Sequence, residues 1–415
     1  MRKRQFGFFA VTLLVLTACQ SADDNGAADN GGSPGSGGGQ EIDEEAVTGT
    51  VRFSGFRSSD AEEELLQQVL DAFAEQYPNI EVNYEPIPEG YVEQMTAQFS
   101  AGEPPDLFYM QAEFANAWVE DGLIEPLDPY FEGNPEFDTE PFFDPLLAAF
   151  QFDGQTYGLP KDASPLALFS NPDLLGEAGV EVPTNWDELR SAAEALTSDG
   201  VAGLCVGPEL PRVGAFIYQA GGAIYNEDKT ELTITEPAAV EGIDLYLELH
   251  ESGSLQTPSE IGASWCGEAF GQGQAAMTME GNWLVPALEN DFPDTSYEIA
   301  ELPQGAEPGN LAFTVSYSIG ADSPNKEAAW VLLQYLTGPE GMAEWTSLGL
   351  ALPSREDVDP AEGREALVAG LEYATAYAFE RAFPDVQGAF NNELTRVLSE
   401  GGTGQEIADA AAAAR

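Results

Sequence analysis

Apolar residues switch between strand-like and helix-like spacing along the first folded part of the chain. Residues 50–54 alternate apolar and polar positions, and residues 61–76 then carry apolar side chains every three or four positions. These periods are typical of a half-buried strand and of an amphipathic helix. The same patterns continue with a strand at 80–84, a helix at 91–100, a strand at 106–110 and a helix at 114–121. This order predicts a mostly parallel sheet.

Amphipathic patterns also dominate the rest of the chain. We expect helices at 185–196, 238–250, 325–336 and 379–396 and in the alanine-rich tail from 404. The chain has 415 residues, more than one domain usually contains, and 43% of them are hydrophobic. The sequence therefore predicts an α/β protein that forms two lobes.

The N-terminus has the pattern of an export signal. Arg2, Lys3 and Arg4 precede an apolar run at 6–16, and Leu16-Thr17-Ala18-Cys19 follows. A basic region, a short apolar region and a small-residue cleavage site define a signal peptide, here residues 1–19. Leu-Thr-Ala-Cys resembles a bacterial lipobox, in which Cys19 would become the lipidated first residue; a plain secretory signal with a chance cysteine is the alternative. No later apolar stretch reaches the roughly 20 residues of a spanning helix, so the lipid is the membrane anchor we expect.

Residues 20–46 are predicted to be a disordered linker. They consist mainly of Gly, Ser, Asp, Asn and Glu. Such a segment buries too little apolar surface to offset the entropy of ordering. It would tether the folded body to the lipid.

Two cysteines remain once Cys19 is set aside. Cys205 and Cys266 form an even pair in an exported protein, where disulfides persist. We predict a disulfide between them. Two buried free thiols are the alternative, because cysteine is often a small core residue.

The charge balance is strongly acidic. The chain has 72 Asp plus Glu against 15 Lys plus Arg, a formal net charge of −57. Nucleic acid and anionic membrane surfaces are therefore not expected as partners. So much self-repulsion suggests a surface adapted to saline surroundings, where counterions screen it.

The motifs of several enzyme classes are missing from the sequence. His250 is the single histidine, and we find no Cys-x-x-Cys, no Gly-x-Ser-x-Gly and no phosphate loop. We therefore expect neither a metal nor another cofactor, and no enzymatic activity. Carboxylates are too numerous for a glycosidase pair to be recognised by inspection, so a glycoside hydrolase remains a less favoured alternative.

Seven blocks, in this order and spacing, resemble one family. They are Ser54-Gly55-Phe56, Gly102-Glu103-Pro104-Pro105-Asp106, Tyr157-Gly158-Leu159-Pro160, Leu168-Phe169-Ser170-Asn171-Pro172-Asp173-Leu174-Leu175, Pro183-Thr184-Asn185-Trp186-Asp187-Glu188-Leu189, Ala275-Ala276-Met277-Thr278-Met279-Glu280-Gly281-Asn282-Trp283 and Ser323-Pro324-Asn325-Lys326-Glu327-Ala328-Ala329. Over about residues 47–400 the chain resembles the extracellular solute-binding proteins, family 1, of carbohydrate ABC transporters.

The resemblance implies a two-lobed periplasmic-binding-protein fold of type II, maltose-binding-like, with a hinge between the lobes. The N-terminal lobe would comprise residues 47–161 and 303–347, and the C-terminal lobe residues 162–302 and 348–415. The ligand would lie in the cleft between them.

The implied function is that of the extracytoplasmic binding component of an importer. A monomer, anchored through Cys19 to the outer face of the cytoplasmic membrane, would capture a sugar or oligosaccharide and deliver it to the permease subunits. A binding protein for another small solute (polyol phosphate, polyamine or peptide) is the alternative.

A sugar cleft needs aromatic platforms and planar hydrogen-bonding groups. The resemblance gives the platform role to Trp283, and the preceding Glu280 and Asn282 are further ligand-binding candidates; a buried core tryptophan is the alternative for Trp283. Lys161 and Asp162 fall at the expected hinge crossing, where Asp162 would accept sugar hydroxyls. An ion pair that braces the hinge is the alternative there.

Strand ends supply further candidates. Phe56 ends the first strand, where a capped helix start is the alternative, and Tyr109 and Gln111 end the third, whose side chains alternate between core and cleft. Blocks that lie near the cleft in the family contain Trp265, Tyr317 and Arg355.

Overall fold

The computed structural model describes residues 42–415, except residues 58, 135–136, 199 and 227–228. The signal peptide, Cys19 and most of the predicted linker lie outside the described residues. Residues 42–46, assigned to the linker from composition, belong to the folded body. The Glu44 carboxylate accepts hydrogen bonds from Tyr77 Oη (2.9 Å) and Gln334 Nε2 (2.8 Å), and Ile42 packs on the adjacent core. These contacts order residues 42–46, so this part of the predicted linker is folded.

The first sheet contains the predicted alternation of strands and helices. Its strand order is β2 (Ile80–Ile87), β1 (Gly49–Phe56), β3 (Leu107–Gln111), β14 (Val315–Ile319) and β6 (Leu159–Pro160). Strands β2, β1 and β3 are parallel, and β14 is antiparallel to both β3 and β6. The helices that follow these strands are α1 (Asp60–Gln76), α2 (Tyr91–Ala101), α3 (Ala112–Glu120) and α13 (Lys326–Thr337). Ser59 caps α1 by accepting a hydrogen bond from the backbone N–H of Glu62 (3.1 Å), which fixes the loop after β1.

The second sheet is separate and mixed. Its strand order is β10 (Leu255–Gln256), β9 (Leu204–Cys205), β11 (Met277–Glu280), β8 (Ala167–Ser170) and β12 (Glu298–Ala300). Its helices are α7 (Trp186–Leu196), α8 (Leu210–Gln219), α9 (Pro237–Glu251), α11 (Cys266–Gly271), α12 (Leu284–Asp291), α16 (Phe383–Glu400) and α17 (Gly404–Ala413). The helix predicted at 379–396 starts four residues later, at Phe383, with Pro384 in its first turn, where proline is favoured.

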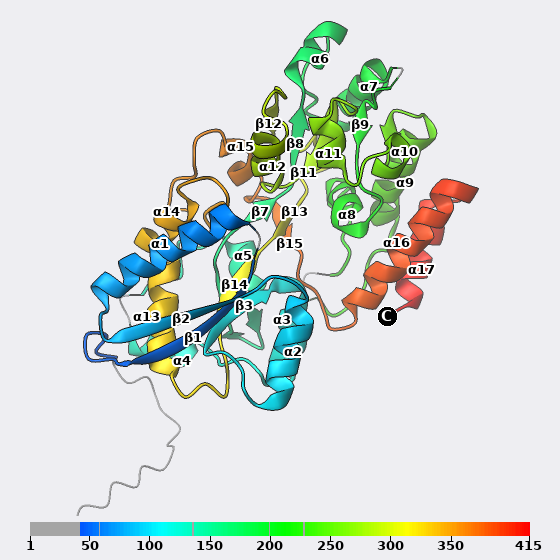
Figure 1. Ribbon diagram of the computed structural model, residues 1–415. Coiled ribbons are helices and arrows are strands. Elements are labelled where there is room, and N and C mark those ends of the chain that lie inside the picture. Colours follow the sequence, from blue (N-terminus) through cyan, green and yellow to red (C-terminus); the bar gives the residue numbers. More distant parts are fainter. Residues whose placement is uncertain (1–41, 58, 135–136, 199, 227–228) are drawn as a thin grey trace, which may run out of the picture. The chain divides into compact units, whose positions relative to one another are not determined.

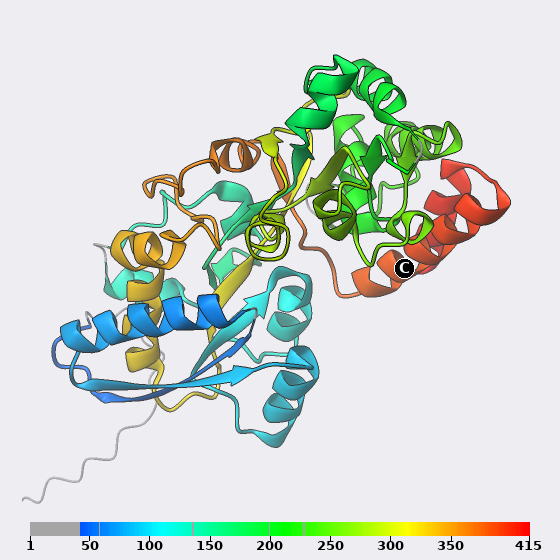
Figure 2. The same ribbon diagram turned by 45° about the horizontal axis from the view of Figure 1, so that its top comes forward.

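A small third sheet lies between the two larger ones (Figure 1; a turned view is in Figure 2). It consists of β15 (Ala374–Ala376), β13 (Asn310–Phe313) and β7 (Ser164–Pro165). Residues 161–163 join β6 of the first sheet to β7, and Thr314 joins β13 to β14 of the first sheet. The remaining elements are α4 (Asp128–Gly133), α5 (Asp144–Ala148), β4 (Gln151–Phe152), β5 (Gln155–Thr156), α6 (Pro172–Ala178), α10 (Pro258–Ile261), α14 (Pro339–Thr346) and α15 (Glu365–Ala369).

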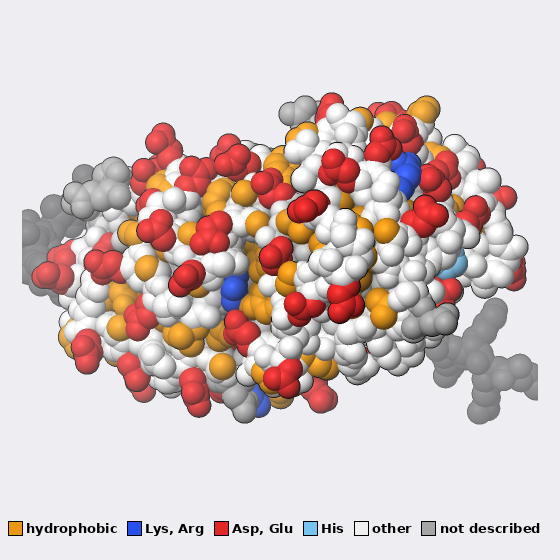
Figure 3. All heavy atoms as spheres, turned by 90° about the horizontal axis from the view of Figure 1, so that it is seen from above, with side chains coloured by type: hydrophobic (Ala, Val, Ile, Leu, Met, Phe, Trp, Pro, Cys, Tyr) orange, Lys and Arg blue, Asp and Glu red, His pale blue; other side chains and the backbone are white. Residues whose placement is uncertain are grey.

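Each large sheet has its own hydrophobic core. Val51 and Phe53 of β1 are fully buried in the first, and Met277 and Met279 of β11 in the second. Two cores joined by short crossing segments make the chain a two-lobed α/β protein. In the part of the chain that the structure describes, no helix is both long and apolar enough to cross a bilayer. Acidic side chains are spread over the face shown in Figure 3, with few basic ones among them.

The predicted disulfide is present. The sulfur atoms of Cys205 and Cys266 are 2.03 Å apart, and the Cα atoms are 5.5 Å apart. The bond joins β9 to the start of α11, and β9 pairs with β11 at Cys205 and Thr278. The alternative of two free thiols is therefore wrong for this structure.

Candidate functional site

A cavity of about 750 Å³ is lined by segments of both lobes and by the crossing between them. Phe56 and Glu62 line it from the first lobe, residues 161–164 from the crossing, and Trp283 from the second lobe. A second chamber of about 180 Å³ shares Asp162, Ser164 and Trp283 with the first. The two hollows therefore meet at these three residues, and we treat them together as the cleft.

Trp283 lies at the junction of the two hollows. Its ring is half-buried and stands edge-on to Phe313, with ring centroids 5.7 Å apart. The indole Nε1 donates a hydrogen bond to Glu280 Oε2 (2.9 Å). A Cβ atom at Gly281 would lie 2.3 Å from Cζ3 of Trp283, so only glycine allows the indole to approach the backbone there. Trp283 therefore borders both hollows and also packs on the core, so it has contacts of both the predicted platform and the alternative core residue.

Glu280 lies behind Trp283 and is only 3% exposed. Its Oε2 atom accepts a second hydrogen bond, from Arg212 Nη2 on α8 (2.9 Å). Burial raises the pKa of the Glu280 carboxyl, and Arg212 and the indole N–H partly counteract this effect. The Arg212 guanidinium lies against the indole ring, 5.0 Å from its centroid.

Asn282 ties the second lobe to two other segments. Its Nδ2 donates hydrogen bonds to the carbonyl oxygens of Gly349 and Leu350 (3.0 Å each), and its backbone N–H donates to Ser164 Oγ (3.2 Å). The side chain is 2% exposed and lines the larger hollow, and its Oδ1 has no partner among the described residues. The Asn282 side chain therefore ties these segments together, and its Oδ1 atom is buried without a described partner.

Lys161 and Asp162 form the ion pair that was the alternative to ligand binding. Lys161 Nζ bonds Asp162 Oδ2 and lies 3.9 Å from Glu62 Oε1. Lys161 is 1% exposed, and its ammonium lies 4.9 Å from the ring centroid of Tyr109 and 4.6 Å from that of Trp345. Asp162 keeps 20% of its side chain exposed and lines both hollows. Bracing of the crossing and acceptance of ligand hydroxyls are therefore compatible roles for Asp162.

The strand-end candidates divide between cleft and core. Phe56 lines the larger hollow and Gln111 the smaller one. Tyr109 and Tyr317 are 3% and 1% exposed, and their ring centroids are 5.5 Å apart inside the first core. Tyr109 has the same strand parity as Gln111, but Phe56 and Lys161 cover its ring. Alternation along β3 could not reveal this, because the covering residues come from other segments.

Trp265 and Arg355 have packing roles in the structure. Trp265 is half-buried beside Gly267 and the core around Phe270. Arg355 is 4% exposed, donates two 2.8 Å hydrogen bonds to Asp357 and lies over the ring of Phe142. Neither residue borders the two hollows of the cleft.

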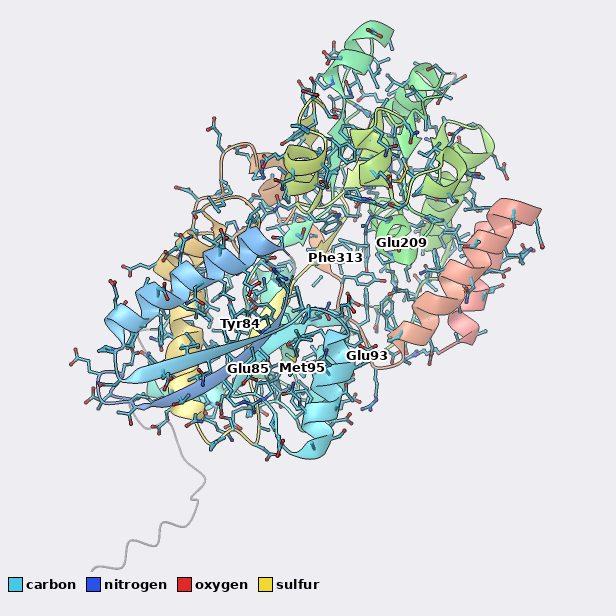
Figure 4. The ribbon with its side chains drawn as sticks, viewed as in Figure 1. Tyr84, Glu85, Glu93, Met95, Glu209 and Phe313 are labelled. Carbon is cyan, nitrogen blue, oxygen red and sulfur yellow. A yellow bond between two sulfur atoms is a disulfide. The ribbon has the colours of Figure 1, made fainter. Side chains whose placement is uncertain are left out.

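Several cleft residues escaped the sequence reasoning. Phe313 at the end of β13 and Tyr377 after β15 line the smaller hollow, with ring centroids 5.2 Å apart; Figure 4 labels Phe313 and also Glu209, which precedes α8. The larger hollow also receives Glu62, Ser164, Asn290 and Asp291. These positions are scattered along the chain and carry no local motif, apart from the position of Glu62 in the first turn of a capped helix. The site as a whole combines a continuous aromatic wall with carboxylate, amide and hydroxyl groups, which suits a polyhydroxylated ligand.

Comparisons with known proteins identify the family and the fold. The chain matches the bacterial extracellular solute-binding proteins over residues 58–343. A binding protein of Brucella abortus (strain 2308) is 29% identical over 323 residues, 75% of this chain and 78% of that protein. The maltotriose-binding protein of Pyrococcus abyssi (strain GE5 / Orsay) is 25% identical over 334 residues, 75% of this chain and 69% of that protein.

Among solved structures, an ABC substrate-binding protein of Listeria monocytogenes in complex with cycloalternan matches with a TM-score of 0.77. It is 25% identical, and the match covers 88% of this chain and 97% of that one. A sugar-binding protein of Xanthomonas citri shares the fold, with the same TM-score of 0.77. The chain therefore belongs to the bacterial extracellular solute-binding proteins and has their two-lobed, maltose-binding-like fold.

Proposed function

We propose that this chain is the extracytoplasmic binding component of an ABC importer and that it captures a sugar or oligosaccharide in the cleft. The half-buried indole of Trp283, which borders both hollows beside Asp162, carries this proposal. An aromatic face suits the C–H face of a sugar ring, and the surrounding polar groups suit its hydroxyls. The maltotriose-binding relative and the cycloalternan complex support a saccharide ligand.

The charges in the cleft favour a neutral ligand over a phosphorylated one. Among the described residues that line the two hollows, Lys161 is the only cation, and it is already paired with Asp162. A phosphate would need a cation that is free to bind it. A polyamine would instead use carboxylates, and Glu62, Asp162 and Asp291 line the larger hollow. Polyamines are therefore the solute class that an experiment must separate from saccharides.

The delivery route is inferred from the predicted signal sequence and the fold. We infer that Cys19 carries the lipid, that residues 20–41 tether the body to the outer face of the cytoplasmic membrane, and that the protein acts as a monomer. The lobes would hinge at residues 160–164, at Thr314 and near Leu352, which bridges Ala163. The closed, loaded form would engage the permease subunits.

We also infer that the acidic surface is an adaptation to salt. A net charge of −57 repels itself strongly at low ionic strength, and counterions reduce that repulsion. The melting temperature should then rise from low to molar salt. A melting temperature that does not depend on salt would remove this inference.

A thermal-shift panel tests the proposed function. The mature protein is heated with maltotriose, a galacto-oligosaccharide, erythritol, glycerol 3-phosphate, spermidine and a tripeptide. A ligand at about 100 times its Kd stabilises the folded state by about 2.7 kcal/mol, enough for a clear shift. We expect a saturable shift with at least one neutral saccharide and no release of reducing sugar over time. A shift with only a charged solute, or steady sugar release, would overturn the proposal.

A further inference from the structure

We propose that Arg212 and Glu280 are positioning residues that hold Trp283 as a fixed platform in the cleft. The inference relies on the proposed function only for the nature of the ligand. The hold on the indole ring follows from contacts within the second lobe and is testable without any ligand.

One carboxylate oxygen joins the three side chains. Glu280 Oε2 accepts the indole N–H of Trp283 at 2.9 Å and an N–H of Arg212 at 2.9 Å. The first contact fixes the nitrogen edge of the indole, and the second fixes the carboxylate. Rotation of Trp283 out of this position would break a hydrogen bond to a buried ionised group, which is costly.

The same arginine supports the face of the ring. Its guanidinium carbon lies 5.0 Å from the Trp283 centroid and 6.0 Å from the Phe313 centroid. A cation at this distance over an indole is attracted by the ring. Phe313 stands edge-on to Trp283 at an interplanar angle of 71°, and Gly281 lets the ring approach the backbone. The nitrogen edge and part of the ring surface are thus occupied by the protein, and the remainder borders the cleft.

The Arg212–Glu280 ion pair is more buried than the ion pairs at the surface of the chain. The side chains of Arg212 and Glu280 are 13% and 4% exposed, and neither residue lines the two hollows. Removal of Arg212 would leave the Glu280 carboxylate buried without a cation, whereas removal of Glu280 would leave Arg212 with Glu209 at 3.9 Å. The partners are 68 residues apart in the sequence and come from α8 and β11, so the contact is tertiary. Because both partners touch Trp283, the pair acts on the platform and not only on the packing of the lobe.

A platform fixed before binding lowers the cost of binding. A tryptophan that is free to change rotamer must be immobilised by the ligand, which reduces affinity. A ring locked by a supporting shell avoids that loss. The pair should therefore raise affinity without touching the ligand.

The test compares Arg212→Met, Arg212→Lys and a control, Arg190→Met, in the mature protein. Arg190 pairs with Glu248 at 2.9 Å in the same lobe but at the surface. The ligand-free readout is the near-ultraviolet circular dichroism contributed by Trp283, obtained by subtracting the spectrum of Trp283→Phe. The ligand readout is the Kd for maltotriose. Melting curves confirm that each variant is folded.

We expect Arg212→Met to lose most of the Trp283 signal and to weaken maltotriose binding about tenfold, the size of a partly desolvated cation–π contact. Arg212→Lys keeps the charge but not the planar group. It should therefore retain part of the Trp283 signal and part of the affinity for maltotriose. Arg190→Met should match the wild type. An unchanged Trp283 signal in Arg212→Met, or an equal loss in Arg190→Met, would refute the positioning role.

The test also covers a wild type that does not bind maltotriose and an Arg212→Met variant that does not fold. If wild-type protein does not bind maltotriose, the spectra alone judge the positioning role, and the solute panel judges the proposed function. If Arg212→Met does not fold, Glu280→Gln takes its place, because glutamine can still accept the indole N–H while the ion pair is lost. A reduced Trp283 signal then supports the role, and an unchanged signal refutes it.

Discussion

Each of the two walls of the cleft combines a cation, an aromatic ring and a carboxylate. The walls differ in which of these groups borders the cleft. In the first lobe and crossing, Lys161 lies against the rings of Tyr109 and Trp345 and is paired with Asp162. In the second lobe, Arg212 lies against Trp283 and is paired with Glu280. On the first wall the rings are buried and the carboxylate of Asp162 borders the cleft, whereas on the second wall Glu280 is buried and the ring borders the cleft.

This difference gives the two walls complementary surfaces. The crossing presents a hydrogen-bond acceptor that is held in place by a buried cation, and the second lobe presents an aromatic ring that is held in place by a buried ion pair. A sugar ring needs both, because its edge carries hydroxyls and its face is apolar.

The two lobes differ in covalent reinforcement, and removal of the disulfide should have a greater effect than any other substitution described below. All cysteines other than Cys19 lie in the second lobe, where Cys205 and Cys266 close a loop with a sequence separation of 61. Replacing both by alanine should lower the unfolding free energy by about 2–4 kcal/mol, because the unfolded chain gains entropy. Urea unfolding with and without reductant measures it. A double variant as stable as the oxidised protein would show that the bond does not reinforce the lobe.

The next effect concerns the cation of the first wall. Asp162→Asn leaves Lys161 with Glu62 at 3.9 Å as its remaining carboxylate, in a site where lysine is 1% exposed. Stability should fall by about 2–3 kcal/mol, somewhat less than for a fully buried pair because Asp162 is partly exposed. Asp187→Asn, at a 97% exposed partner of Arg190, is the control and should change little. Equal urea midpoints for the two variants would mean that the Lys161–Asp162 pair does not stabilise the crossing.

The smallest effect is the pH dependence of the second wall. Burial raises the pKa of Glu280 above its unfolded value, against the opposing influence of Arg212 and with a small contribution from Glu209 in the same direction. In the window between the two pKa values the folded state binds the extra proton, so stability is highest below the unfolded pKa and falls as pH rises through the folded pKa. The difference in unfolding free energy between wild type and Glu280→Gln should therefore shrink with rising pH across this window. A difference that grows with pH across this window would mean that the ionised form is favoured.

The sequence predicted those features that are repeated along the chain or fixed by neighbouring residues. The order of strands and helices in the first sheet follows from apolar periodicity, and the disulfide follows from a leftover pair of cysteines. Trp283 came from a block that resembles the family. Tyr109 and Tyr317 were expected at the cleft but are buried. Phe56 and Lys161 cover Tyr109, and Tyr317 packs against Phe53 and Tyr109, so the burial of both depends on tertiary contacts. Arg212 and Tyr377 were missed for the same reason, since contacts such as that between Arg212 and Glu280 join positions 68 residues apart.

In the proposed function, the aromatic wall at Trp283 holds a neutral saccharide. Isothermal titration of the wild type, Trp283→Ala and Trp265→Ala with the saccharide that gives the largest shift in the panel tests it most directly. We predict one site per chain, a Kd weakened at least about 30-fold by Trp283→Ala, as for a buried aromatic anchor, and a wild-type Kd for Trp265→Ala. A Trp283→Ala protein that binds the saccharide as tightly as the wild type would contradict the account.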